Sequence, residues 1–260
     1  KSFDLKKNND LPIFNGGLVG YFGYDCVRYI ESRLVDSEPP DTIGTPDALF
    51  MISDEVAVFD NLKNKLHLIV LIESEDDEEK ANTRLDELED QLKENLPYED
   101  FNKPAKSIEE TDFVSGFGED EFKNSVDRAK KYIESGDIMQ VVCSQRMSIP
   151  FNADPVALYR SIRQLNPSPY MYYLNLKEFH IVGSSPEILA RLEDGKITVR
   201  PIAGTRRRGK DELDDAAMEK DLVNDPKEIA EHLMLIDLGR NDVGRVAKPG
   251  TVNVTEKFGI

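Results

Sequence analysis

Residues 200–246 read RPIAGTRRRGKDELDDAAMEKDLVNDPKEIAEHLMLIDLGRNDVGRV, and this stretch decides the fold of the chain. It opens with a run of β-branched and apolar residues that predicts a short strand over 197–202. The strand breaks at Gly204, and a loop follows that holds Thr205 and the three arginines 206–208. The pattern therefore predicts a strand, a glycine-containing bend and then helices rich in carboxylates.

The start of the last helix in this stretch is marked by Asp225 and Pro226. Aspartate caps the first free N–H groups of a helix, and proline fits the first helical position. Asp154 and the proline after it give the same signal for a helix over 155–165. Apolar side chains then recur at helical spacing, at Ile229, Leu233 and Ile236. We expect this last helix to end near Gly239, because glycine is the usual residue just beyond a helix end.

Two glutamates on this predicted helix are candidates for a metal site. Glu228 and Glu231 lie three positions apart, so both carboxylates project from one face. Carboxylates beside apolar side chains are unfavourable unless a cation or a proton neutralises them. Mg²⁺ accepts one or two protein carboxylates and completes its shell with water and substrate anions. The alternative is a pair of solvated glutamates on an amphipathic helix, and the spacing by itself favours that alternative.

The motif PIAGTR, followed by D-x-KE-x-AEH-x-ML-x-DLGRND-x-GRV, resembles the chorismate-utilising enzymes, and among them the large subunits (component I) of the anthranilate synthases. The resemblance covers most of the chain from Gly16 onward, with a divergent stretch near residues 75–112. It implies an α+β fold, a layered antiparallel β-sheet sandwich with outer helices. It also implies that 1–106 are the remainder of an N-terminal regulatory region and that 107–260 are the first part of a chorismate-binding catalytic region.

The resemblance also assigns roles to single residues. It implies that Gly204, Thr205 and Glu228 bind the substrate, that Glu231 holds the metal and that Glu187 is the acid that helps the ring hydroxyl leave. The residue types suit these roles, because glycine allows close backbone approach and a threonine hydroxyl donates without adding bulk. By spacing alone, Glu187 is equally well explained as a surface glutamate in a turn.

The activity that the resemblance implies is Mg²⁺-dependent amination of chorismate with ammonia, followed by elimination of pyruvate to give anthranilate. This reaction is the first committed step of tryptophan biosynthesis. Ammonia is expected from a glutamine amidotransferase subunit, anthranilate synthase component II, because neither cysteine here has a nucleophile-like setting. Pro169, Tyr170 and Met171 match the element that binds tryptophan, the feedback inhibitor of the family.

Two positions distinguish the anthranilate synthase activity from related activities on chorismate. Ala203 stands where the aminodeoxychorismate synthases carry a nucleophilic lysine. Gln140, in a strand predicted over 138–149, stands where isochorismate and salicylate synthases carry a lysine that activates water, and glutamine cannot accept a proton at neutral pH. Aminodeoxychorismate synthase component I of the folate pathway is the alternative enzyme, and a non-catalytic chorismate-binding or regulatory scaffold is the alternative outside enzymes. The arginines 206–208 either bind an anion or balance acidic neighbours.

The net charge, the apolar runs and the cysteines of the chain limit which binding partners and which cellular compartment we expect. The 260 residues carry a net charge of −17, which argues against nucleic acid as a partner. We expect no signal peptide and no membrane span, since no apolar run is long enough. Cys26 and Cys143 lie in apolar, strand-like sequence and predict reduced thiols, hence a cytoplasmic protein. The family's later catalytic elements are expected beyond Ile260, so we expect these residues alone to be inactive.

The remaining elements follow from hydrophobic periodicity and turn residues. The glycine-punctuated segment 16–24 predicts a strand in which the glycines allow close approach of another backbone. The other predictions are a hairpin of strands 49–60 and 65–73, a solvated helix within 74–96, a linker over 97–118, a helix over 122–133, and strands over 170–174, 180–184 and 188–192.

Overall fold

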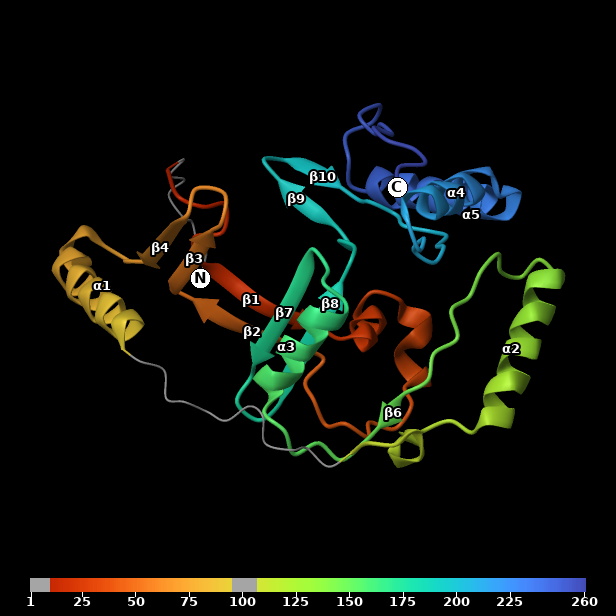
Figure 1. Cartoon of the computed structure of the whole chain (residues 1–260), viewed down its shortest axis with the longest axis horizontal. Coiled ribbons are helices and arrows are strands. Elements are labelled where there is room, and N and C mark those ends of the chain that lie inside the picture. Colours follow the sequence, from red (N-terminus) through yellow and green to blue (C-terminus); the bar gives the residue numbers. More distant parts are fainter. Residues whose placement is uncertain (1–9, 95–106) are drawn as a thin grey trace. The chain divides into compact units, whose positions relative to one another are not determined.

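The computed structural model describes residues 10–94 and 107–260, so part of the predicted linker 97–118 lies outside the described residues. Contacts between residues divide the chain into two units, with 10–94 in the first and 107–260 in the second (Figure 1). The described strands form antiparallel pairs, and helices accompany them in both units. The predicted α+β class is therefore confirmed.

The first unit contains two antiparallel strand pairs and one long helix. β1 (Gly17–Phe22) pairs with β2 (Ala48–Ser53), and β3 (Glu55–Asp60) pairs with β4 (Lys65–Val70). The helix α1 (Glu78–Lys93) packs against β4. Three short 3-10 helices complete the unit, at η1 (Tyr24–Tyr29), η2 (Ser32–Ser37) and η3 (Glu75–Asp77).

Three details of this unit bear on the sequence predictions. The predicted strand 49–60 is interrupted at Asp54, so that its two halves pair with different partners. A Cβ on Gly20 would lie 1.9 Å from the backbone oxygen of Leu49, which confirms that this glycine allows two strands to approach closely. The strand-like surroundings predicted for Cys26 are wrong, because the residue lies in the 3-10 helix η1.

The second unit begins with the short helix η4 (Glu110–Asp112), the strand β5 (Val114–Ser115) and the helix α2 (Glu119–Glu134). The strand predicted over 138–149 is wrong over most of its length. Its backbone is strand only in β6 (Met147–Ser148), which pairs with β5. A strand needs a neighbour to satisfy its N–H and C=O groups, and among the described residues this segment has one only at β6.

The centre of the second unit is a hairpin covered by a helix. The helix α3 (Pro155–Leu165) begins as predicted, with the Asp154 carboxylate accepting from the N–H of Val156 at 2.8 Å. It packs against β7 (Tyr170–Asn175) and β8 (His180–Ser185), which pair in antiparallel register.

The segment that holds the candidate site follows this hairpin. β9 (Arg191–Glu193) turns into β10 (Lys196–Thr198), so the strand predicted over 197–202 is much shorter than expected. The helices α4 (Glu212–Asn224) and α5 (Pro226–Gly244) follow and pack against each other (Figure 1).

The helix α5 does not end at Gly239 as predicted but continues to Gly244. A Cβ at Gly239 would lie 3.3 Å from Cγ2 of Val199, in the segment that follows β10. The glycine therefore gives room for close packing on the helix side, which is the other common reason for glycine inside a helix.

Burial is slight throughout the described residues. Among the described hydrophobic side chains, only Ile69 in β4 and Leu176 after β7 are buried, at 7% and 8% of their full exposure. Many large apolar side chains lie open, with Leu189 exposed to 97%. Two-stranded sheets bury little apolar surface by themselves. In residues 10–94 and 107–260, no helix combines the length and apolar character that crossing a membrane requires.

Candidate active site

The bend at Gly204 lies directly against the first turn of α5. A Cβ on this glycine would stand 2.1 Å from Oε2 of Glu228 and 3.1 Å from Cδ1 of Leu222. The first distance is shorter than any atomic contact and the second is tight, so only glycine fits here with the neighbours as they stand. The glycine-containing bend that the sequence predicts therefore lies against the helix that carries Glu228.

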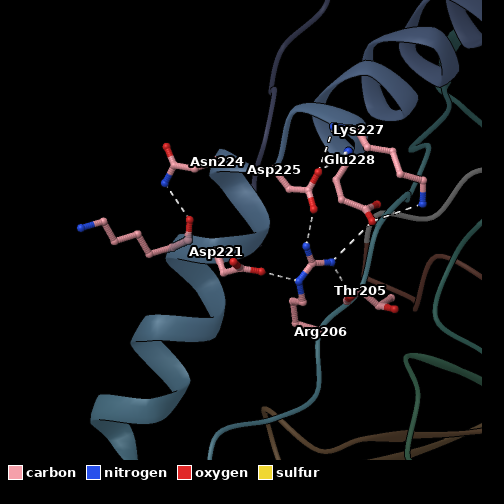
Figure 2. A network of polar contacts seen from close by, with 8 residues as sticks. Thr205, Arg206, Asp221, Asn224, Asp225, Lys227 and Glu228 are labelled. Carbon is pink, nitrogen blue, oxygen red and sulfur yellow. Dashed lines mark hydrogen bonds and ion pairs between the residues drawn. The ribbon is translucent and has the colours of Figure 1, made fainter.

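A network of ion pairs around Arg206 joins this bend to both helices (Figure 2). Its Nε donates to Oδ2 of Asp221 at 2.6 Å, and its Nη2 donates to Oδ2 of Asp225 at 2.7 Å. Its Nη1 lies 3.4 Å from Oε1 of Glu228 and also donates to the backbone oxygen of Thr205 at 3.1 Å. The hydrogen bond to Asp221, followed by that to Asp225, raises the pKa of the Arg206 guanidinium.

Asp225 serves the helix and the loop at once. Its Oδ1 accepts from the N–H groups of Lys227 and Glu228 at 2.9 and 3.4 Å, which caps α5, while Oδ2 receives Arg206. The backbone N–H of Lys227, with those of Glu228 and the Arg206 side chain, lowers the pKa of the Asp225 carboxyl. Capping by Asp225 thus fixes where α5 starts and where its first carboxylate points.

The other two arginines of the triplet pair with α4. Arg207 lies 2.9 Å from Asp214, and Arg208 lies 2.7 Å from Asp215. The ion pair with Arg207, ahead of a backbone hydrogen bond from Lys210, lowers the pKa of Asp214. Of the two readings given by the sequence, the structure shows the arginines balancing acidic neighbours.

Glu231 lies one turn after Glu228 and contacts a distant segment. Its Oε1 accepts from Nε2 of Gln140 at 3.2 Å, which brings together two of the residues singled out in the sequence. Because the amide is neutral and a carboxylate has several acceptor positions, Glu231 keeps charge and oxygen lone pairs available. Glu228 is different, since Arg206 and Lys227 already pair with it at 3.4 and 3.7 Å.

These donors fit Mg²⁺ in kind, as oxygen ligands of which one or two are protein carboxylates. Glu231 is the better ligand of the pair, since no cation is paired with it in the contacts that the structure records. Within the described residues, however, no group of three or more His, Cys, Asp or Glu side chains is arranged to hold a metal ion. A metal bound here would take its remaining ligands from water and from the substrate.

Glu187 contacts the segment between β10 and the Gly204 bend. Its Oε1 accepts from the backbone N–H of Ile202 at 3.0 Å, two residues before Gly204. The turn is held locally, because Oγ of Ser185 accepts from the N–H of Glu187 at 3.3 Å and donates to its backbone oxygen at 2.9 Å. The carboxylate is therefore anchored rather than free to rotate at the surface.

The remaining candidates lie on other elements. Pro169 precedes β7, and Tyr170 and Met171 are its first residues, with the Tyr170 hydroxyl accepting from Nη2 of Arg191 at 3.0 Å. His232, next to Glu231, accepts from the backbone N–H of Phe258 at 3.4 Å. It therefore holds the C-terminal segment against α5.

Sequence reasoning missed two features of the site. It did not distinguish Arg206 from its two neighbours, and it did not pair Gln140 with Glu231. The many acidic residues in α4 and at the start of α5 indicate that the arginines form ion pairs with these helices. No signal in the sequence indicated the Gln140 contact, because 91 positions separate the partners.

The Gly204–Thr205 bend, with the carboxylates of Glu228 and Glu231 on the helix beside it, is the candidate site of this chain. The chain belongs to the family of chorismate binding enzymes, whose model matches residues 2–260. Among curated relatives, anthranilate synthase component 1 of Pseudomonas aeruginosa is 56% identical over 251 residues, which cover 95% of this chain and 51% of that protein. The same component of Neisseria gonorrhoeae is 53% identical over 255 residues, again 95% of this chain and 51% of the relative.

A solved structure gives the same result. The crystal structure of anthranilate synthase component I from Streptococcus pneumoniae TIGR4 superposes with a TM-score of 0.85 at 34% sequence identity, over 97% of this chain and 55% of that one. The chain spans about half the length of the curated relatives that it matches.

Proposed function

We propose that this chain carries the chorismate-binding portion of an Mg²⁺-dependent anthranilate synthase. The observation that carries the proposal is the close approach of Gly204 to Glu228, one helical turn from Glu231. The segment that leads to Gly204 also holds Glu187, through the backbone N–H of Ile202. The relatives named anthranilate synthase component 1 support it.

The roles of the residues follow from their chemistry. The backbone N–H and hydroxyl of Thr205, next to the glycine, would hold the ring carboxylate of chorismate. Glu231 would hold Mg²⁺, which neutralises and orients the substrate carboxylate when it is bound. Glu228, which pairs with Arg206 at 3.4 Å and with Lys227 at 3.7 Å, would contact the substrate with part of its negative charge offset.

Glu187 would transfer a proton to the ring hydroxyl as ammonia adds to the ring and the hydroxyl leaves as water. The aminated carbon then loses its proton and the bond to the enolpyruvyl oxygen breaks; the departing group takes up a proton and leaves as pyruvate, which gives anthranilate. The bond from the Ile202 N–H to Oε1 fixes the orientation of this carboxylate and leaves Oε2 to carry the proton.

Several finer points belong to the same proposal. Ammonia would come from a glutamine amidotransferase subunit, as the designation component 1 of the relatives suggests. Tryptophan would bind at Pro169, Tyr170 and Met171 as a feedback inhibitor. The thiols of Cys26 and Cys143, both unbridged, suit the cytoplasm. The strand pairs would belong to a layered sandwich, with 1–106 in its regulatory region and 107–260 in its catalytic region.

Aminodeoxychorismate synthase component I is the second candidate function, and Ala203 speaks against it. The alanine offers no amine that could attack the ring, whereas the aminodeoxychorismate synthases carry lysine at this point. A non-catalytic scaffold would keep the fold without metal-dependent binding of chorismate.

The test is to identify the product by mass spectrometry. The protein at its natural length is incubated with chorismate, ammonium chloride and Mg²⁺. Anthranilate with release of pyruvate supports the proposal. An aminated product that keeps its enolpyruvyl group supports the second candidate, and unchanged chorismate excludes both enzymes.

A further inference from the structure

The three arginines 206–208 differ in their exposure and in their ion-pair partners, and Arg206 stands apart from the other two in both. Arg207 and Arg208 each pair with one aspartate of α4, and their side chains are 57% and 90% exposed. The Arg206 side chain is 23% exposed and contacts carboxylates of both helices (Figure 2). Arg206 is therefore the member of the triplet that joins the loop to the junction of α4 and α5.

The partners of Arg206 sit at positions that set the shape of the candidate site. Asp221 lies in the last turn of α4, and Asp225 is the cap of α5. Glu228 is the carboxylate that touches Gly204, and its side chain is 14% exposed. A planar guanidinium can satisfy several carboxylates at fixed angles, which a lysine ammonium does not reproduce. One side chain thus fixes the helix junction and the bend relative to each other.

The charges matter as much as the geometry. Chorismate is a dicarboxylate, and a largely buried Glu228 next to its binding bend would repel it if the glutamate stood alone. The guanidinium, which Glu228 shares with Asp221 and Asp225, offsets part of this charge from 3.4 Å. Arg206 also donates to the backbone oxygen of Thr205, which orients the peptide that follows the bend.

We infer that Arg206 is a positioning residue for substrate binding: it ties the Gly204–Thr205 bend to the α4–α5 junction and offsets part of the negative charge of Glu228, so that an anionic ring can approach. The inference rests on the proposed function. It does not place Arg206 in contact with the substrate. Its loss therefore weakens binding of chorismate and leaves the chemical step largely intact.

The experiment compares Arg206→Ala with the matched control Arg207→Ala in the protein at its natural length. Arg207 has the same charge and the neighbouring position, but its ion pair lies on the outside of α4. Anthranilate formation is followed at saturating Mg²⁺ and ammonium, and thermal unfolding is recorded for each variant. We expect R206A to raise KM for chorismate about ten-fold or more with kcat within about three-fold, the pattern of lost uniform binding. R207A changes KM less than about two-fold, since an exposed ion pair contributes little.

Two further variants keep the inference testable if R206A does not fold. Arg206→Lys keeps the charge without the planar fork, and Asp225→Asn keeps the helix cap while removing one ionic partner. Both are expected to raise KM less than R206A does, with kcat retained. A purely structural role would instead lower the unfolding temperature and leave KM unchanged.

The outcomes are distinct. If the unsubstituted protein makes no anthranilate and binds no chorismate, the proposed function fails and this inference fails with it. If the unsubstituted protein is active but the Arg206 variants match R207A in KM, or lose kcat alone, the positioning role is wrong and the proposed function stands.

Discussion

The replacement of Gly204 by alanine tests the contact between the bend and α5. The new Cβ would lie 2.1 Å from Oε2 of Glu228, and ordinary contact begins at 3.4 Å, so the oxygen must retreat by about 1.3 Å. The colliding atom is the far end of a flexible side chain, so the fold can yield to the methyl group. We therefore expect unfolding to become easier by only about 1 kcal/mol, a typical effect of a single substitution.

The effect on activity should be much larger than the effect on stability. A retreat of this size disturbs the contact of Arg206 with Glu228, which is already 3.4 Å, and displaces a carboxylate that we propose contacts the substrate. Misplacement by about 1 Å lowers the rate roughly a hundred-fold. We expect kcat/KM for chorismate to fall by about that factor in the protein at its natural length, measured by anthranilate fluorescence with ammonium as the nitrogen donor.

Gly244→Ala is the matched control for this substitution. It is the last residue of α5, and a Cβ there would meet no atom within 4 Å. Its kcat/KM should equal that of the unsubstituted protein. Adding Glu228→Asp to Gly204→Ala shortens the colliding side chain and should restore part of the lost activity. A Gly204→Ala protein with unchanged kcat/KM would refute the reasoning.

Three further predictions concern the neighbours of this site and the first unit. Gln140→Lys should pair with Glu231 in place of the neutral amide and raise the Mg²⁺ concentration for half-maximal activity roughly ten-fold. The fold lowers the pKa of Asp225 below its usual value of 3.8, so the ionised carboxylate stabilises the folded state fully above pH 3.8. This stabilisation is lost as the pH falls through the lower folded-state pKa. Asp225→Asn should therefore flatten the acid side of a plot of unfolding temperature against pH. Gly20→Ala should destabilise the first unit by about 1–3 kcal/mol in a denaturant titration, because its Cβ meets the immovable backbone oxygen of Leu49 at 1.9 Å.

Features that depend on local interactions were predictable from the sequence. Asp225 and Pro226 gave the start of α5, and Asp154 gave the start of α3, because a helix cap involves residues only two or three positions apart. The spacing of Glu228 and Glu231 likewise follows from the helix repeat. Gly20 could be read as a point of close approach because glycine inside a strand has few other uses.

Features that depend on distant partners were not predictable in this way. The strand expected over 138–149 has the right residue types, but a strand forms only where another strand pairs with it, and the structure gives it a partner at β6 alone among the described residues. Gly239 was read as a helix end, although glycine serves equally well for close packing, as it does here against Val199. The particular partners of Arg206 depend on how α4 meets α5, which charge patterning does not specify.

Magnesium-dependent binding of chorismate is the most direct test of the central claim, that the carboxylates around the Gly-Thr bend hold a cation and an anionic ring together. Calorimetric titration with chorismate is carried out with and without Mg²⁺, on the protein at its natural length and on its Glu231→Gln variant. We predict that Mg²⁺ strengthens binding at least about ten-fold and that Glu231→Gln abolishes this gain, because an amide is a weaker ligand for a hard cation. Equal binding with and without Mg²⁺, or a full Mg²⁺ effect in the variant, would contradict the account.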